Sequence, residues 1–245
     1  IASVALMDAR SIAVTAANKG FLTAATDFDG KFETYNYHFD EKIYANRVYD
    51  SKGIADPSVE IKFGPNIKDW PAMKPLSDDL LIKIVSEIHD PVTTTDELIP
   101  SGETSSFRSN PLGLAEFTLS RRDPAYVGRA KAVRDGSDEV KAEVKTAAAA
   151  LDKFSAGFGS RAEAAGLGSS IFAVKPGDGS AREQAASCQK VLGGWANIAN
   201  EYATKRYRSN LINWGMLPFL YKDGDKNLPF ANGDYVFIPD VKKMV

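Results

Sequence analysis

The sequence from residue 174 to residue 194, VKPGDGSAREQAASCQKVLGG, decides how the rest of the chain is organised. The β-branched and aromatic run that leads into it, residues 170–174, predicts a buried strand. A proline and two glycines then predict a tight turn. Ser180 is followed three residues later by Glu183, which is the spacing of a capping box and predicts a helix that begins at Ser180. Two adjacent glycines predict where that helix ends.

Strand, glycine turn and helix N-terminus together predict a binding site for an anion. The first backbone N–H groups of a helix have no partner within the helix, and the helix dipole favours negative charge beside them. Arg182, in the first turn, would add a cation. The same spacing is equally compatible with a well-capped helix that binds nothing.

The order of residues in this stretch is similar to that of a known family. GDGSAREQAAS followed by VLGG resembles the G-x-G-S-S-R-E-H-A-A…LGG signature of the C-terminal "swivel" domain of the aconitase family. The resemblance implies that Gly179, Ser180, Ala181 and Arg182 bind substrate and that Glu183 supports them from behind. The sequence departs from the signature at Ala181, because the resemblance places the family's general-base serine there.

A second stretch, residues 92–111, reads VTTTDELIPSGETSSFRSNP and predicts a loop, because turn formers and hydroxyl residues dominate it. Its T-T-D-E, S-G and F-R elements resemble the family's T-T-D-H-I-S-x-x-G…F-R segment. The resemblance implies that Arg108 binds substrate and that Asp96 supports the site. Glu97 stands where the family has histidine, and we take it as a hypothetical replacement for the missing base. Composition alone favours a solvated turn.

Composition and charge limit the classes of partner. The chain has 245 residues, of which 44% are hydrophobic and 25% charged, which is typical of a globular protein. A formal net charge of −2 makes a nucleic-acid or anionic-membrane partner improbable. A single cysteine, Cys188, excludes an intramolecular disulfide and a cysteine-rich metal site within the chain. The sequence has no apolar run long enough to cross a bilayer and no secretory leader, so we expect the protein in the cytoplasm, or in the mitochondrial matrix if the source is a eukaryote.

The N-terminal part predicts an extension rather than part of the main domain. Residues from about Ala2 to Asn18 predict a mostly buried helix, and the segment resembles the end of the third domain of the family. A buried helix at the very start suggests that the chain was cut from something longer. The aromatic residues that follow, between Asp27 and Gly53, predict packing against an interdomain seam. Base stacking on nucleic acid is the weaker alternative, because no basic patch accompanies them.

The remaining elements alternate irregularly between strand and helix. Alternating or apolar runs predict strands at residues 59–63, 80–88, 195–199, 217–221 and 235–238, and apolar spacing predicts a helix at residues 137–154. A GFGSRA sequence near residue 157 follows this helix instead of a strand, so it does not predict a dinucleotide site. This alternation predicts an α/β fold class. The resemblance implies that residues 59–245 form a layered β/β/α domain similar to the family's swivel domain, and that residues 1–58 are the end of a preceding domain and a linker.

The resemblance implies the C-terminal part of a hydro-lyase that adds and removes water on a hydroxy-polycarboxylate. It also implies a [4Fe–4S] cluster in N-terminal aconitase-like domains on the same or a separate chain. This chain would bind no cofactor, because such a cluster needs three thiolates and only Cys188 is present. The isolated chain should therefore be inert. The alternative, favoured by Ala181, is a non-catalytic domain that binds a polycarboxylate or a partner protein.

Overall fold

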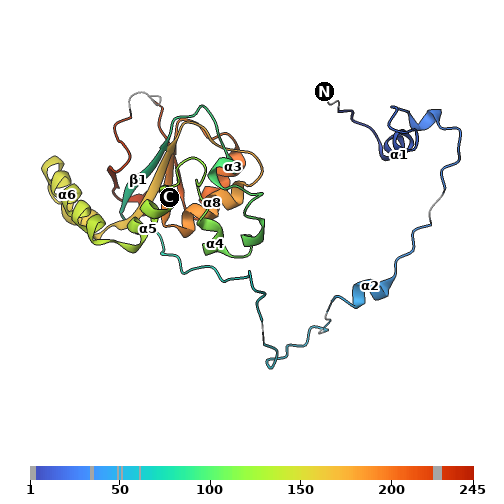
Figure 1. The fold of residues 1–245 in the computed structure, drawn as a ribbon. Helices are drawn as coiled ribbons and strands as arrows, with labels where there is room; N and C mark the ends of the chain where they lie inside the picture. The colour runs from blue at the N-terminus through green and yellow to red at the C-terminus, as the bar shows by residue number, and fades with distance from the viewer. Residues whose placement is uncertain (1–3, 34–35, 49, 51, 61, 223–227) are drawn as a thin grey trace. The chain divides into compact units, whose positions relative to one another are not determined.

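The computed structural model describes residues 4–33, 36–48, 50, 52–60, 62–222 and 228–245. The chain divides into two compact units, residues 1–60 and residues 61–245, called here the smaller and the larger unit. Figure 1 shows the smaller unit in blue and the larger unit in green to red. Each unit is described by itself, and the assignment of residues 1–58 to a preceding domain stays a prediction.

The smaller unit contains α1 (Ala9–Ala17), a 3-10 turn (Ala25–Asp27) and α2 (Glu41–Ala45). Asp8 caps α1, since its carboxylate accepts from the amides of the second and third residues that follow. Only Ser11 and Val14 of α1 are buried. The expectation of a mostly buried helix from Ala2 to Asn18 is therefore wrong in length and burial, although Ala2 lies outside the described residues. An alanine-rich helix buries a face only where a core is present to receive it.

The aromatic residues that are predicted to pack against an interdomain seam lie in this smaller unit. The described aromatic side chains of the segment between residues 27 and 53 are exposed, among them Phe32, Tyr37, Phe39 and Tyr44. Tyr35 and Tyr49 lie outside the described residues. What these rings would cover stays a prediction.

The larger unit is built on a five-stranded, mostly parallel sheet. Its strands are β1 (Leu80–Ile88), β3 (Gly166–Ala173), β5 (Gly194–Ala199), β6 (Leu217–Leu220) and β7 (Tyr235–Ile238). They lie in the order β6-β5-β3-β1-β7, and only the pairing of β7 with β1 is antiparallel. β2 (Thr93–Thr94) and β4 (Pro176–Asp178) form a second, parallel pair. The predicted α/β class is confirmed.

Helices connect the strands. They are α3 (Thr95–Leu98), α4 (Pro111–Ala115), α5 (Tyr126–Asp135), α6 (Asp138–Phe154), α7 (Phe158–Ala164), α8 (Arg182–Val191), α9 (Lys205–Asn213) and α10 (Val241–Met244). The largest apolar cluster joins one face of the sheet to α4, α5, α8 and α9, with Tyr126 and Tyr207 among its fully buried side chains. Smaller clusters cover the opposite face. β1 reads as a continuous apolar run because it is covered on both faces.

One predicted strand is absent. Residues 59, 60, 62 and 63 have no strand structure, and Val59 and Phe63 are exposed, while Ile61 lies outside the described residues. Alternation gives a strand only where a neighbouring strand pairs with it, and this segment belongs to neither of the two sheets that the described residues form. The helix at residues 137–154 is confirmed as α6, with Ser137 Oγ accepting from the amide of Val140.

No helix among the described residues is both long and apolar enough to cross a bilayer.

Candidate functional site

The two segments that carry the sequence motifs lie against each other. β2 pairs with β4 in parallel, with Thr93 opposite Pro176 and Thr94 opposite Asp178. Beyond the pairing, the amide of Ala181 donates a hydrogen bond to Thr95 Oγ1 at 3.3 Å, across 86 positions of sequence. The fold thus brings the first turn of α3 to the turn that precedes α8.

The turn before α8 requires glycine at two positions. Gly177 has φ of +95°, and a Cβ there would lie 2.3 Å from Cγ of the buried Tyr207 ring. Gly179 has φ of +121°, and its Cβ would lie 2.4 Å from Thr95 Oγ1. Both the backbone conformation and the lack of space exclude larger residues. The turn is therefore fixed by close approach to α9 and to α3.

The predicted capping box at Ser180 and Glu183 is wrong. α8 begins at Arg182, its N-cap is Ala181 with φ of −82° and ψ of +42°, and no side chain caps it. The turn extends one residue further than the spacing predicts, so Ser180 lies outside the cap position. Ser180 is exposed and makes no hydrogen bond to a described residue, and Glu183 Oε1 accepts instead from Trp214 Nε1 at 3.0 Å. The first amides of α8 and the Ser180 hydroxyl are consequently not used in capping.

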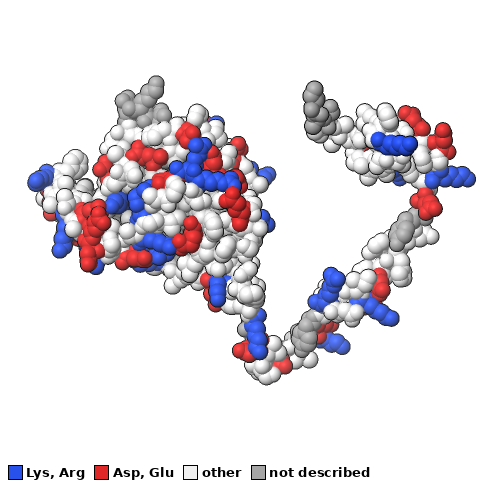
Figure 2. Space-filling model, viewed as in Figure 1, with Lys and Arg blue, Asp and Glu red and all other residues white. Residues whose placement is uncertain are grey.

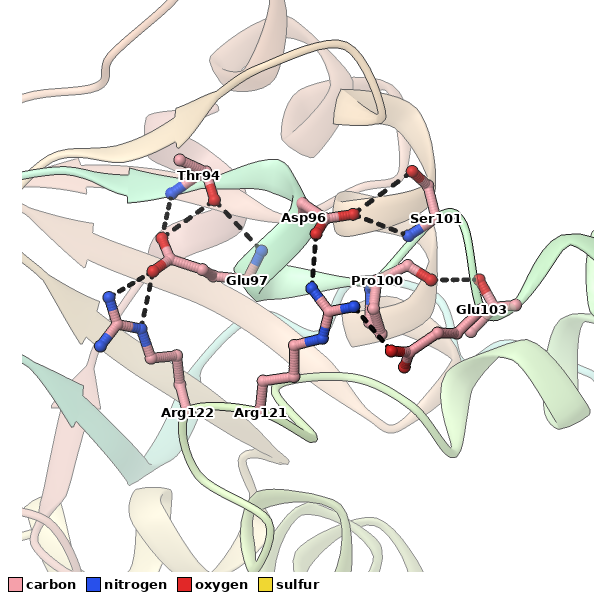
Figure 3. Close-up of polar contacts among 9 residues, drawn as sticks. Thr94, Asp96, Glu97, Pro100, Ser101, Glu103, Arg121 and Arg122 are labelled. Carbon is pink, nitrogen blue, oxygen red and sulfur yellow. Dashed lines mark hydrogen bonds and ion pairs between the residues drawn. The ribbon is translucent and has the colours of Figure 1, made fainter. Parts of the chain in front are cut away.

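A capping box does form on the neighbouring helix, within the segment predicted to be a loop. The Thr94 amide donates to Glu97 Oε2 at 2.7 Å, and the Glu97 amide donates to Thr94 Oγ1 at 3.2 Å. Figure 3 shows these bonds at the start of α3. The segment holds α3, a 3-10 turn (Ser105–Phe107) and α4, so the loop prediction is wrong over these residues.

The second carboxylate oxygen of Glu97 pairs with an arginine that the motifs do not include. Arg122 Nε donates to Glu97 Oε1 at 2.7 Å. Burial acts to raise the pKa of Glu97, but the hydrogen bonds from Thr94 and the pair with Arg122 outweigh it and hold that pKa below its usual value. Glu97 is therefore ionised and fully bonded, and it can accept a proton only by giving up one of these bonds. Its role as a replacement base stays a prediction.

Arg121 ties the same segment to the turn before α5. Its guanidinium bridges Asp96 Oδ2 and Glu103 Oε1, each at 2.7 Å, and Asp96 Oδ1 accepts from the Ser101 amide at 3.1 Å (Figure 3). From sequence, residues 120–124 predict only a charged turn. Two adjacent arginines followed by Asp-Pro indicate that ion pairs form near this turn. The chain has many acidic residues, however, and the sequence does not show which of them pair with the two arginines.

The two arginines predicted to bind substrate lie on different sides of the first turns of α8. Arg182 is half-buried, and its Nε is buried without a partner among the described residues. Arg108 is exposed and lines a small cavity of about 50 Å³ together with Glu183 and Gln184. That cavity does not include Arg182, so a shared pocket for the two arginines stays a prediction.

The residues of this chain do not fit a [4Fe–4S] cluster. Cys188 is buried on α8, and burial raises the pKa of its thiol to about 12, which opposes the thiolate that iron binds. Among the described residues there is no group of three or more histidine, cysteine or acidic side chains placed to hold a metal ion.

Charge on the larger unit is mixed. On the face of the larger unit shown in Figure 2, acidic and basic side chains lie intermixed. Such a face does not present the single-sign field that attracts nucleic acid.

Two comparisons with known proteins bear on this site. Residues 168–224 match the model of the family described as "Aconitase C-terminal domain", a range that holds the turn before α8, α8 itself and α9. The resemblance predicted from the GDGSARE…LGG motif is confirmed over this range. The segment with Asp96, Glu97 and Arg108 lies outside it. Curated protein sequences give no match.

Among solved structures, the chain is similar to 3-isopropylmalate dehydratase from Methanocaldococcus jannaschii. The two chains are 21% identical, with a TM-score of 0.41, and the alignment covers 67% of this chain and 72% of that one.

Proposed function

We propose that the larger unit is the swivel-type part of an aconitase-family hydro-lyase and that it binds a hydroxy-polycarboxylate at the turn formed by residues 177–182. The match of residues 168–224 to the aconitase C-terminal domain supports the family. The observation that carries the site is the uncapped N-terminus of α8, which follows three exposed residues and is held in place by Thr95. Free N–H groups fixed in this way bind carboxylates well.

Arg182 would neutralise one substrate carboxylate. Its unpartnered Nε and its place in the first turn of α8 put a cation beside the free amides. A guanidinium and a helix N-terminus together both orient and neutralise a carboxylate. Arg108, on the flank of the same helix, would hold a second carboxylate of the same substrate. The cluster of the family would act on the substrate hydroxyl from the N-terminal domains, while these arginines and amides of this chain would bind and orient the substrate.

Ser180 joins Glu97 as a candidate proton acceptor. Ala181 cannot carry a proton, and the Ser180 hydroxyl is exposed beside it with no capping duty. Glu97 would first have to leave Arg122. In protein that includes the N-terminal domains and is loaded with iron, Ser180→Ala and Glu97→Gln separate the two. Loss of roughly 10²–10⁴ in kcat with an unchanged KM marks the base; if neither variant loses rate, both assignments fail.

A non-catalytic polycarboxylate-binding domain is the second candidate, and Ala181 is the observation that favours it. The same iron-loaded protein tests it. A wild type without hydratase activity that gains activity with Ala181→Ser supports the binding domain. An active wild type removes it.

Binding can be measured on this chain alone by calorimetric titration with citrate. We expect Arg182→Ala to weaken citrate binding by about tenfold or more, because a hydrogen bond to a charged group typically contributes about 1.5–3 kcal/mol. Arg108→Ala should weaken it less, since Arg108 is exposed. Arg47→Ala is the control, because it removes the same charge from an exposed position of the smaller unit. Equal affinities for the wild type and Arg182→Ala would remove the site assignment.

A further inference from the structure

The other end of α8 holds a buried lysine without an acidic partner. Lys190 is 9% exposed, in the last turn of the helix. Its Nζ lies 3.5 Å from the centre of the Trp195 ring and 3.4 Å from the Gly215 carbonyl oxygen, to which it donates a long hydrogen bond. A buried ammonium normally has a carboxylate beside it, because desolvation is costly. Among the described residues, no ion pair of Lys190 is found.

Lys190 borders a cavity. This space has a volume of about 80 Å³ and lies between residues 71–74 and the end of α8, with the Trp195 ring in its wall. Trp70, just before this segment, packs against Trp214 with ring centres 4.6 Å apart and ring planes tilted by 38°, which ties the segment to the end of α9. Since one water needs about 10–15 Å³ of such volume, the cavity has room for a small anion.

The walls of the cavity carry positive charge only. Lys74 and Arg134 line it together with Lys190, and none of its lining residues is acidic. A wider groove on the other side of Lys190 is lined by Lys74 and Arg208 and again by no acidic residue. Asp135, next to Arg134 in the sequence, accepts from Arg134 Nε at 2.7 Å and from its Nη2 at 3.1 Å. The carboxylate of Asp135 is therefore paired with Arg134, and no residue that lines the cavity offers a carboxylate to Lys190.

We propose that this cavity binds a small oxyanion, a carboxylate or a phosphate group, between Lys190 and Arg134. Arg134 donates from Nη1 to the Val191 carbonyl at 3.4 Å and from Nε and Nη2 to Asp135, so its guanidinium is held at the end of α8 and each of its two terminal nitrogens keeps one N–H that these bonds do not use. The anion would supply the counter-charge that the protein does not give to Lys190. The site lies at the opposite end of α8 from the turn at residues 177–182 and does not depend on the proposed function.

The pH dependence of binding follows from the buried amine. Burial lowers the pKa of Lys190 to about 8, and a bound anion would raise it again. The cationic form is the one that attracts an anion, so binding should be full below pH 8. Above that value the affinity should fall by as much as about tenfold per pH unit. The other charged groups around the amine are Lys74, Arg134, Asp135 and Arg208. The pair between Arg134 and Asp135 raises the pKa of the guanidinium and lowers that of the carboxyl, so these two groups keep their charge over this range.

Trace labelling of the native chain with N-hydroxysuccinimidyl acetate tests the site at Lys190 itself. Acetylation at each lysine is measured by mass spectrometry between pH 6 and pH 10, with inorganic phosphate, with acetate, or with neither. We expect at least one of the anions to protect Lys190 and to move its labelling curve to higher pH. Lys141, an exposed lysine of α6, is the control and should show no protection. Protection by phosphate alone or by acetate alone identifies the oxyanion group.

Equal labelling of Lys190 with and without both anions would overturn the proposal, as would equal protection of Lys190 and Lys141. Calorimetry gives a second measure in the Arg182→Ala background, where binding at the turn before α8 is weakened. There, Lys190→Met should weaken binding of the protecting anion by about tenfold or more, because the charge is lost while the apolar stem remains. Lys141→Met should leave that binding unchanged. An unchanged affinity in folded Lys190→Met also overturns the proposal.

Discussion

The two segments that meet at the candidate site differ in how fully their polar groups are bonded. Residues 93–103 hold a reciprocal capping box and pairs with two arginines. Residues 177–182 are held by fewer contacts: Asp178 lies opposite Thr94 in the β2–β4 pair, Thr204 Oγ1 donates to the Gly177 carbonyl at 3.1 Å, and the Ala181 amide donates to Thr95. Residues 178–180 are exposed.

This difference gives the two segments different roles: one supports the site, and the other offers binding groups to a ligand. Groups that are already bonded within the fold hold a neighbour in position, whereas free groups on a fixed backbone are available to a ligand. The 93–103 segment is the support, and the turn before α8 presents its amides and hydroxyl. Substitutions in the two segments should therefore have different effects on stability.

The largest effect on stability is expected from Gly177→Ala. The new Cβ would lie 2.3 Å from Cγ of Tyr207, and the position has a positive φ. Tyr207 cannot move aside easily, because its hydroxyl accepts from Gln189 and Asn197, each at 2.9 Å, in the core. Overpacking and backbone strain together should lower the free energy of unfolding by about 2–4 kcal/mol. Urea denaturation measures it.

Gly128→Ala is the matched control for this substitution. Gly128 lies in α5 with open space around it, so alanine should raise the free energy of unfolding by about 0.5–1 kcal/mol through helix propensity. If Gly177→Ala were as stable as the wild type, the turn would not be held by Tyr207, and the comparison between the two segments would fail.

The sequence predicts those parts of the site whose signals are local. The apolar face of α8, with Ala185, Cys188 and Leu192, is buried as the helical spacing predicts. The strand before the turn is confirmed as β3, and the two motif segments lie together, as their resemblance to one family implies. Each of these predictions depends on a hydrophobic periodicity or on an ordered motif that spans about 20 residues.

The rest depends on tertiary contacts that the sequence does not contain. The sequence predicts Ser180 as the N-cap of α8, whereas the N-cap in the structure is Ala181, one residue later. The close approach of Gly179 to Thr95 sets which of these two residues ends the turn. The acidic partners of Arg121 and Arg122 lie up to 32 positions away (122 − 90), among many acidic residues. The strand expected at residues 59–63 has the right alternation, but strand structure also needs a neighbour.

A smaller effect, limited to a range of pH, is expected from Glu97→Gln. The folded-state pKa of Glu97 is lowered, so its contribution to stability is present above the unfolded value of about 4.5 and is lost as the pH falls through the folded value. The variant should be less stable than the wild type at pH 7, and the difference should shrink below about pH 4. Thermal unfolding across pH measures it.

Glu163→Gln is the control for this pH series. Glu163 is exposed on α7, so Glu163→Gln should change the melting temperature little. A constant difference between the wild type and Glu97→Gln would show that the Arg122 pair does not stabilise the fold, and the segment would lose its role as support.

The smallest effect is expected from Arg121→Gln. The Arg121 side chain is 46% exposed and its partners Asp96 and Glu103 are 52% and 62% exposed, so water and salt screen both pairs. Any loss of melting temperature at low salt should disappear at about 1 M NaCl, where the Debye length is about 3 Å. Arg122→Gln is the comparison within the same turn, because its partner Glu97 is 22% exposed and also bonded to Thr94. Its loss should be larger and should persist in salt. If instead Arg121→Gln gave the larger, salt-resistant loss, Asp96 would be the anchor of the support, and the capping box at Thr94 would be secondary.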